Sequence, residues 1–267
     1  MICLKNTVKC PSLKTRTKVV LTDIIHEIDA LKIELDRLRP LDSESVCHAL
    51  DIEYTYESNR IEGNTLTLGE TALVIDKGMT VSGKSMREHL EAINHYQAVL
   101  ILKEFVRDKR PLTEGLIKQV HALILQSIDH KMAGVYRNQP VMISGSLHIP
   151  PAHFVVPELM EKCLQWYDLN KEDLHPVLLA AEMHERVVSI HPFVDGNGRT
   201  SRLIMNLILM QHGYYIANIS GDMENRRDYY NALELCNTVG DKSSFLLLIA
   251  SHVKKGMTRL IKIAQGT

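Results

Sequence analysis

The groups in this chain that could do chemistry are concentrated in one stretch. It runs from His191 to Arg202 and has the sequence HPFVDGNGRTSR. Apolar residues with the spacing of a helix lie on both sides of it, and the pattern breaks in between. The break holds an imidazole, a carboxylate, a Gly-Asn-Gly turn and two guanidinium groups. We therefore expect a helix, a reactive loop and a second helix.

The turn and the two arginines are suited to binding phosphate. Gly196 and Gly198 allow the backbone to turn sharply and to approach a ligand closely. The helix that begins near Gly198 directs unpaired N–H groups and the positive end of its dipole at the loop, which favours an anion. Arg199 and Arg202 share one face of the first helical turn, where their donor forks fit phosphate oxygens. The loop is thus predicted to bind the phosphates of a nucleotide.

An acid and a base flank this turn. The carboxylate of Asp195 would repel a phosphate unless a cation lies between them, and Mg²⁺ is often held by one carboxylate together with substrate phosphates. His191 lies at the end of the preceding helix, and an unperturbed pKa of about 6.5 leaves it mostly neutral near pH 7, as a general base must be. Separately, a Gly-Asn-Gly stretch is usually a plain turn and a histidine at a helix end is often a cap. Their occurrence together favours the functional interpretation.

The stretch resembles the motif of the Fic family, His-Pro-Phe-x-Asp/Glu-Gly-Asn-Gly-Arg-x-x-Arg, and matches it at every motif position. Members of that family typically transfer AMP from ATP to a hydroxyl group of a target protein. The resemblance implies that His191 is the catalytic base and that Asp195 holds Mg²⁺. Asn197 and the loop amides would stabilise charge on the α-phosphate. The implied set of ATP-binding residues is Gly196, Asn197, Gly198, Arg199 and Arg202.

A second motif lies near the end of a helix that we expect from Ser43 or Ser45 to Gly63. Ser58 and Glu62 are four residues apart there and face the same way. Alone, such a pair is ordinary and solvated. Beside the longer motif, it resembles the inhibitory Ser/Thr-x-x-x-Glu-Gly/Asn motif of Fic proteins. The resemblance implies that Glu62 pairs with Arg202 and occupies the place of the ATP γ-phosphate.

The helical pattern is interrupted at residues 134–156. Short β-prone pieces around Ser144-Gly145-Ser146 predict a hairpin, although an ordinary loop fits the pattern slightly better. The segment resembles the Fic flap, which would cover about residues 134–151. By that resemblance, a set of flap residues would align the acceptor residue of the target over the site: Val141, Ile143, Ser144, Gly145 and His148.

A helix that we expect from about Asn225 carries two adjacent tyrosines. They face different directions on a helix, so the ordinary expectation is that one is in the core and one on the surface. The segment resembles the Fic region that holds adenine. The resemblance implies that Tyr229 and Tyr230 lie near the base and Asn237 near the nucleoside.

The remaining apolar pattern predicts an all-α fold, and the resemblance makes it a Fic-type helical bundle with a short β-hairpin flap. We expect a tail over residues 1–18 and a helix from Val19 within an N-terminal segment, 1–44. The Fic domain would then span 45–267. Within it lie the inhibitory helix at about 45–63, the flap at about 134–151 and the core at about 85–250.

Composition narrows the partners and the compartment. The 31 basic and 32 acidic residues give a net charge of −1, which provides no reason to expect nucleic acid or an anionic membrane as partner. The five cysteines are scattered and form no Cys-x-x-Cys pair, so neither a disulfide framework nor a zinc site is indicated. No apolar run approaches the ~20 residues of a membrane span. We expect a protein of the cytoplasm with free thiols.

The predicted function is protein adenylyltransferase, moving AMP from ATP and magnesium to a Tyr, Ser or Thr hydroxyl of a target, with Glu62 as an internal inhibitor. One alternative is de-AMPylation, in which Glu62 positions a water molecule at the same site. Another is a non-catalytic, nucleotide-sensing binding module. Transfer of a different nucleotide or of phosphocholine, self-modification and a homodimer all stay open.

Overall fold

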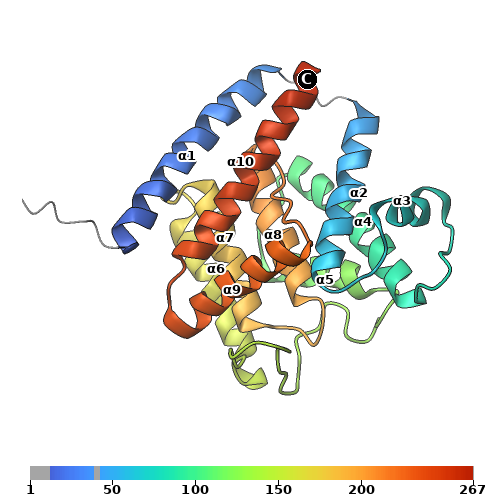
Figure 1. Ribbon diagram of the computed structural model, residues 1–267. Coiled ribbons are helices and arrows are strands. Elements are labelled where there is room, and N and C mark those ends of the chain that lie inside the picture. Colours follow the sequence, from blue (N-terminus) through green and yellow to red (C-terminus); the bar gives the residue numbers. More distant parts are fainter. Residues whose placement is uncertain (1–12, 39–42, 267) are drawn as a thin grey trace, which may run out of the picture.

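The computed structural model describes residues 13–38 and 43–266, which form helices joined by loops, with no strand in these two ranges (Figure 1). The all-α prediction is therefore confirmed. The helices are α1 Leu13–Leu38, α2 Glu44–Ile61, α3 Leu68–Lys77, α4 Met86–Arg107, α5 Glu114–Leu125, α6 Val156–Asn170, α7 Pro176–Ile190, α8 Asn197–Gln211, α9 Met223–Val239 and α10 Ser243–Gln265, with a short 3-10 turn, His153–Val155, before α6. None of these helices combines the length and hydropathy that a bilayer span requires.

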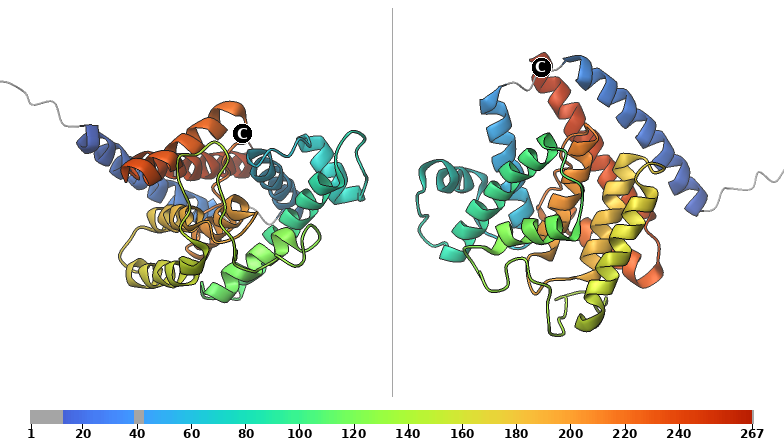
Figure 2. Two further views of the ribbon diagram at one scale, coloured as in Figure 1. Left: turned by 90° about the horizontal axis from the view of Figure 1, so that it is seen from below. Right: turned by 180° about the vertical axis from the view of Figure 1, so that it is seen from behind.

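Helix α8 lies at the centre of the bundle, between α7 on one side and α4 and α5 on the other (Figures 1 and 2). Nearly all of its side chains are buried, including polar ones. The carboxamide of Asn206, for example, bonds both backbone polar groups of Ala217. A helix that is buried on all sides gives a fixed platform, because its side chains cannot repack without leaving cavities. The predicted reactive loop opens this helix.

Helix α1 lies along α10 on the outside of the bundle, and both run in the same direction (Figures 1 and 2). It begins at Leu13, six residues before the predicted start at Val19. Six residues of the predicted tail are therefore helical, and residues 1–12 lie outside the described part of the chain. On the face of α1 that meets the core, Ile28 is fully buried.

Local capping signals set the helices around the site. Thr67 and Glu70 form a capping box at the start of α3, and Ser85 and Glu88 form another at the start of α4. Ser43 caps α2, which ends at Ile61, close to the predicted Gly63. The loop after α2 is tied to α4, because the side chain of Asn64 and the N–H of Thr65 bond to Glu88. The predicted inhibitory motif at the end of α2 lies next to α8.

The predicted β-hairpin is wrong, and the flap is a loop. Its tip is a tight turn in which the N–H of Ser146 donates to the carbonyl of Ile143 over 3.2 Å. The polar groups that follow bond to helices rather than across a hairpin. The N–H of Leu147 donates to Glu234 on α9 over 2.9 Å, and the ring of His148 meets the carbonyl of Ser189 on α7 at 2.8 Å. Because these partners lie outside the flap, its two sides do not form a ladder with each other.

Candidate active site

His191 ends α7 and faces the loop. It adopts a left-handed backbone conformation, with φ 52°, which turns the chain sharply away from the helix axis. Its Nδ1 lies 3.3 Å from the carbonyl of Val188. A carbonyl only accepts, so Nδ1 carries the proton and Nε2 of the neutral ring keeps its lone pair. Burial lowers the pKa of His191 below its ordinary value, and the nearby Arg137 lowers it further. The ring is therefore a neutral base at physiological pH.

Two side chains hold the loop that follows. Asn197 clamps the backbone of Phe193, accepting from its N–H and donating to its carbonyl, both over 2.9 Å. The ring of Phe193 stacks on His121 with centroids 3.6 Å apart. The carboxamide of Asn197 therefore shapes the loop, and a phosphate contact by this residue, which stays a prediction, would involve its backbone N–H or its second amide hydrogen.

His121, on α5, joins the loop to the start of the flap. Its Nδ1 accepts from the N–H of Gly134 and its Nε2 donates to the carbonyl of Asp195, each over 2.9 Å. Both bonds together require the neutral ring, and burial lowers the pKa of His121 to about 4. This residue was not predicted. Its signal was present, since it falls on the apolar face of α5 with Ile117 and Ile124.

Arg137 ties the flap to His191 and was not predicted from the sequence. The side chain is only 3% exposed. Its Nε donates to the carbonyl of His191 over 2.8 Å, and its two terminal nitrogens donate to the carbonyls of Gln139 and Pro151, near the two ends of the flap. The sequence shows an arginine at this position, but only the fold shows that it is buried and that it gathers three carbonyls.

The predicted anion site lies at the first turn of α8. Gly196 has φ 76°, a conformation that suits glycine, and no side chain among the described residues caps this end of the helix. At Gly198, an added Cβ would collide with the carboxylate of Glu62. The carboxylate of Glu62 therefore lies against Gly198, in the first turn of this helix.

The predicted contact between Glu62 and Arg202 is present. An oxygen of Glu62 accepts from Nη2 of Arg202 over 2.7 Å. Ser58 completes the contact, since its hydroxyl accepts from Nε of Arg202 over 3.0 Å and its carbonyl from Nη2 over 2.8 Å. Burial opposes the charge on Arg202, but the carboxylate of Glu62 holds the pKa of the guanidinium above its ordinary value. Ser58 and Glu62, the two residues of the second motif, therefore both accept hydrogen bonds from Arg202.

Asp195 lies at the open side of the loop. One carboxylate oxygen accepts from the N–H of Gly196 over 2.6 Å, and the other pairs with the exposed Arg87. The part of the chain that the structure describes has no cluster of three or more His, Cys, Asp or Glu that could hold a metal. One partly exposed carboxylate beside an anion site fits a metal that shares its ligands with phosphates and water, which is how Mg²⁺ is usually bound.

The predicted flap residues differ in exposure. Ser144 and Gly145 are exposed at the turn, whereas Val141, Ile143 and His148 are half-buried. His148 bonds the carbonyl of Ser189, two residues before His191. The flap is thus anchored to the helix end that carries His191. Whether these residues align a target stays a prediction.

The two tyrosines of α9 lie close to Arg202 and to the end of α2. Tyr229 is buried; its hydroxyl lies 3.0 Å from Nε2 of His184 and 3.4 Å from Nη1 of Arg202. The hydroxyl of Tyr230 donates to the carbonyl of Ile61 over 3.1 Å. One tyrosine is thus in the core and the other is near the surface, as the ordinary interpretation expected, and their contact with adenine stays a prediction.

Asn237 lies two turns further along α9 and is half-buried. Its side-chain nitrogen donates to the carbonyl of Leu233 over 3.0 Å, within its own helix. The structure therefore brings it to the same side of the bundle as the tyrosines without a contact to the phosphate loop, and its role near the nucleoside stays a prediction.

The central helix of this bundle begins at a glycine turn, and the neutral imidazole of His191 lies at the end of the preceding helix. A sequence model described as Fic/DOC family matches residues 111–209. The protein adenylyltransferase Fic of Drosophila melanogaster is 36% identical over 248 residues, covering 87% of this chain and 49% of the relative. The chain thus spans about half the length of such curated relatives.

Solved structures agree with the sequence comparison. A Fic domain containing signaling protein from Bacteroides thetaiotaomicron superposes with a TM-score of 0.81 at 32% identity, covering 90% of this chain and 97% of that one. Fic-1 from C. elegans superposes with a TM-score of 0.79 at 28% identity, covering 95% of this chain and 74% of that one. The chain belongs to the Fic/DOC family.

Proposed function

We propose that this chain is a protein adenylyltransferase that transfers AMP from ATP to a Tyr, Ser or Thr hydroxyl of a target protein, and that Glu62 inhibits it in the state described here. The observation that carries the proposal is the Glu62–Arg202 pair, which places a carboxylate over the uncapped start of α8 beside a neutral His191. The name of the Drosophila relatives, protein adenylyltransferase, supports the same reaction.

The transfer step uses groups whose positions are described above. Nε2 of His191 takes the proton of the target hydroxyl, and the oxygen attacks the α-phosphorus of ATP. A new oxygen–phosphorus bond forms, the bond from the α-phosphorus to the bridging oxygen breaks, and pyrophosphate leaves with that oxygen. The amides of Gly196–Gly198 and the guanidinium of Arg199 bind the phosphates and oppose the negative charge that builds up.

Asp195 is the residue that would hold Mg²⁺ with the nucleotide. The bound ion would neutralise phosphate charge near this carboxylate. In the inhibited state the carboxylate pairs with Arg87, so that arginine must give way when the metal arrives.

Inhibition follows from competition for one guanidinium. Arg202 is 1% exposed, and each of its three nitrogens already has a partner. A γ-phosphate can bind it only by displacing the carboxylate of Glu62, because both need the same donor fork. Withdrawal of Glu62 would therefore allow ATP to bind with its phosphates in the productive position.

The test compares the Glu62→Gly variant with the unchanged chain and the double variant Glu62→Gly/His191→Ala. Each is incubated with a cell lysate, Mg²⁺ and ATP labelled either at the α- or at the γ-phosphate. We expect labelling from the α-label to be weak with the unchanged chain, much stronger with the Glu62→Gly variant and lost in the double variant, with a mass increase of one AMP on a hydroxyl residue. Labelling from the γ-phosphate that Glu62→Gly raises and His191→Ala removes would overturn the proposal, whereas γ-labelling by kinases of the lysate is the same in all arms.

Other outcomes of the same test separate the alternatives. Tight ATP binding with no labelled protein in any arm would favour a nucleotide-sensing module. Loss of AMP from a pre-labelled target, dependent on Glu62, would favour de-AMPylation. Labelling of the chain itself would identify self-modification, and the mass of the active species would show whether a homodimer forms. We also propose a cytoplasmic location, because the buried thiols of Cys163 and Cys236 suit a reducing compartment.

A further inference from the structure

The two arginines of the site are equally buried, but their donors are used differently. All three nitrogens of Arg202 have hydrogen-bond partners. Arg199 is 2% exposed, yet its Nε and Nη1 have no hydrogen-bond partner within the described residues. Buried guanidinium donors are rarely left without a partner, because the desolvation cost is then not offset. Arg199 therefore holds unused donors beside the uncapped helix start.

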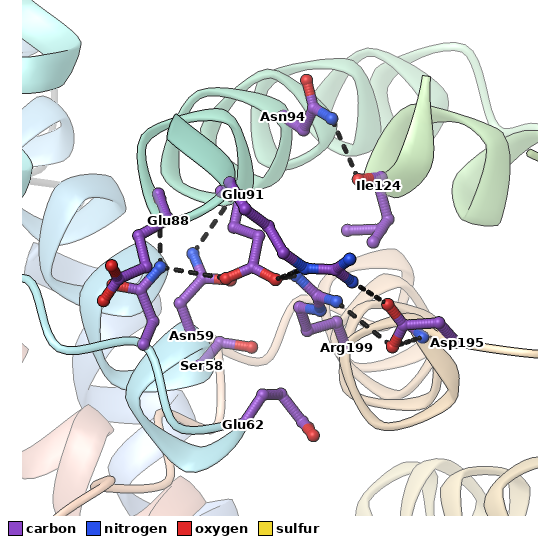
Figure 3. Close-up of polar contacts among 12 residues, drawn as sticks. Ser58, Asn59, Glu62, Glu88, Glu91, Asn94, Ile124, Asp195 and Arg199 are labelled. Carbon is purple, nitrogen blue, oxygen red and sulfur yellow. Dashed lines mark hydrogen bonds and ion pairs between the residues drawn. The ribbon is translucent and has the colours of Figure 1, made fainter. Parts of the chain in front are cut away.

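Glu91 provides the carboxylate nearest to this arginine. It extends from α4, and Figure 3 shows it between Arg199 and the segment that follows the inhibitory helix. Its Oε1 lies 3.3 Å from Nη1 of Arg199. This approach meets the distance for an ion pair but not the geometry of a hydrogen bond, since Nη1 is still without such a partner. Glu91 thus balances the charge of Arg199 without using up its donors.

Glu91 is itself fixed from the side of the inhibitory motif. Its other oxygen accepts from the side-chain nitrogen of Asn64 over 3.1 Å, and its backbone carbonyl accepts from that of Asn59 over 3.3 Å. Asn59 lies on α2, and Asn64 follows Glu62 by two residues. Figure 3 shows Asn59 on one side of Glu91 and Arg199 on the other. A chain of contacts therefore joins the inhibitory segment to the second arginine.

We propose that Glu91 is a positioning residue for ATP, which holds the guanidinium of Arg199 with its free donors toward the phosphate site and ties that position to Asn64. The proposal rests on the proposed function, since Arg199 is taken to bind phosphate. When a buried arginine loses its carboxylate partner, its uncompensated charge destabilises the fold and its side chain can change orientation. Without Glu91, the remaining carboxylate near Arg199 in the described structure is Asp195, at 3.6 Å, and the guanidinium would move toward it.

Removal of an inhibitory carboxylate would have the opposite effect on ATP affinity. Glu62 lies within hydrogen-bond distance of Arg202, so its removal frees a donor for phosphate. Glu91 takes no donor of Arg199 in a hydrogen bond, so its removal frees nothing and loses only the alignment. The sign of the effect on ATP affinity therefore distinguishes a positioning residue from a second inhibitory carboxylate.

The experiment measures ATP and adenosine affinity by calorimetry in the Glu62→Gly background, so that it does not depend on AMP transfer. Glu91→Gln keeps the size of the side chain and its bond to Asn64 but removes the charge. We expect ATP affinity to fall by about tenfold and adenosine affinity to stay the same. Glu104→Gln, the same change at an exposed position of α4, is the matched control and should alter neither.

A double-mutant cycle shows whether Glu91 acts through Arg199. With Arg199→Ala present, Glu91→Gln should have almost no further effect on ATP affinity. Asn64→Ala should weaken ATP binding in the same direction but less, which keeps the proposal testable if Glu91→Gln folds poorly. An increase in ATP affinity, equal losses for ATP and adenosine, or additive effects in the cycle would each overturn it. Labelling by the Glu62→Gly variant reports on the proposed function separately.

Discussion

Replacing Glu62 by glycine should make the protein less stable and its ATP site stronger at the same time. The bond to be lost joins two charged groups over 2.7 Å, with Arg202 1% and Glu62 31% exposed. Hydrogen bonds to charged groups contribute roughly 1.5–3 kcal/mol, and the partial exposure of Glu62 places this one near the lower end, at about 1.5–2 kcal/mol. The same free energy opposes the entry of phosphate, because the carboxylate must first leave.

Two numbers follow from this free energy. At about 1.4 kcal/mol per tenfold, ATP affinity should rise roughly 10- to 30-fold in the Glu62→Gly variant. Without nucleotide, its Tm should fall by about 3–8 °C, given the entropy of unfolding of a domain of this size. With saturating ATP the Tm values of the two proteins should converge, since the lower Kd of the variant offsets the stability that it loses with the bond to Arg202.

The assay is a thermal melt of both proteins with and without ATP and Mg²⁺, together with calorimetry of ATP binding. Glu62→Gln is the control, because it keeps an oxygen for Arg202 but not the charge, and it should fall between the two. Equal ATP affinity in Glu62→Gly and the unchanged chain would refute the competition argument. So would a variant that melts at a higher temperature without nucleotide.

The other predictions concern the base, the flap and the end of the inhibitory helix. Burial lowers the pKa of His191, and only the neutral ring can act as the base. In the Glu62→Gly variant, log(kcat/KM) should therefore fall only as the pH drops through a value below about 6.5. Initial rates measured against pH check this, and a fall in log(kcat/KM) that begins above that pH would contradict it. In the Arg137→Lys variant the charge is kept, but a lysine cannot bond to all three carbonyls. Target labelling should therefore fall several-fold, while ATP affinity measured by calorimetry stays the same. A parallel loss of ATP affinity would contradict a role confined to the flap. Tyr230→Phe removes the hydrogen bond to the carbonyl of Ile61, next to Glu62. Basal labelling by the otherwise unchanged chain should then rise a few-fold, which corresponds to roughly the free energy of one hydrogen bond. A fall in labelling would show that the hydroxyl binds ATP instead.

Features encoded by neighbouring residues could be predicted from the sequence. The capping boxes at Thr67 and Ser85 set the starts of helices through hydrogen bonds between residues three positions apart. The loop at 191–202 holds its reactive groups within twelve consecutive residues. The pair between Glu62 and Arg202 was predicted only through a family resemblance, because 140 positions separate the two residues.

The parts that could not be predicted depend on contacts between distant segments. Arg137 and Glu91 look like ordinary charged residues in the sequence, and only the packed bundle shows that both are mostly buried beside the loop. The residues of the flap fitted an ordinary loop slightly better than a hairpin, and the hairpin was predicted through the resemblance to the Fic flap. The structure has the loop, in which Glu234 and Ser189 bond to the polar groups of the flap. Local β propensity is a weak guide where a neighbouring helix offers better partners.

The central claim is that the start of α8 binds the triphosphate while His191 acts only on the incoming hydroxyl. The most direct measurement compares Glu62→Gly with Glu62→Gly/His191→Ala, by calorimetry with ATP and Mg²⁺ and by transfer of α-labelled AMP to protein. The account predicts equal ATP affinity in the two variants and a loss of transfer of at least about a hundredfold in the second, the scale of general base catalysis. Undiminished transfer without the imidazole, or no ATP binding in either variant, would contradict it.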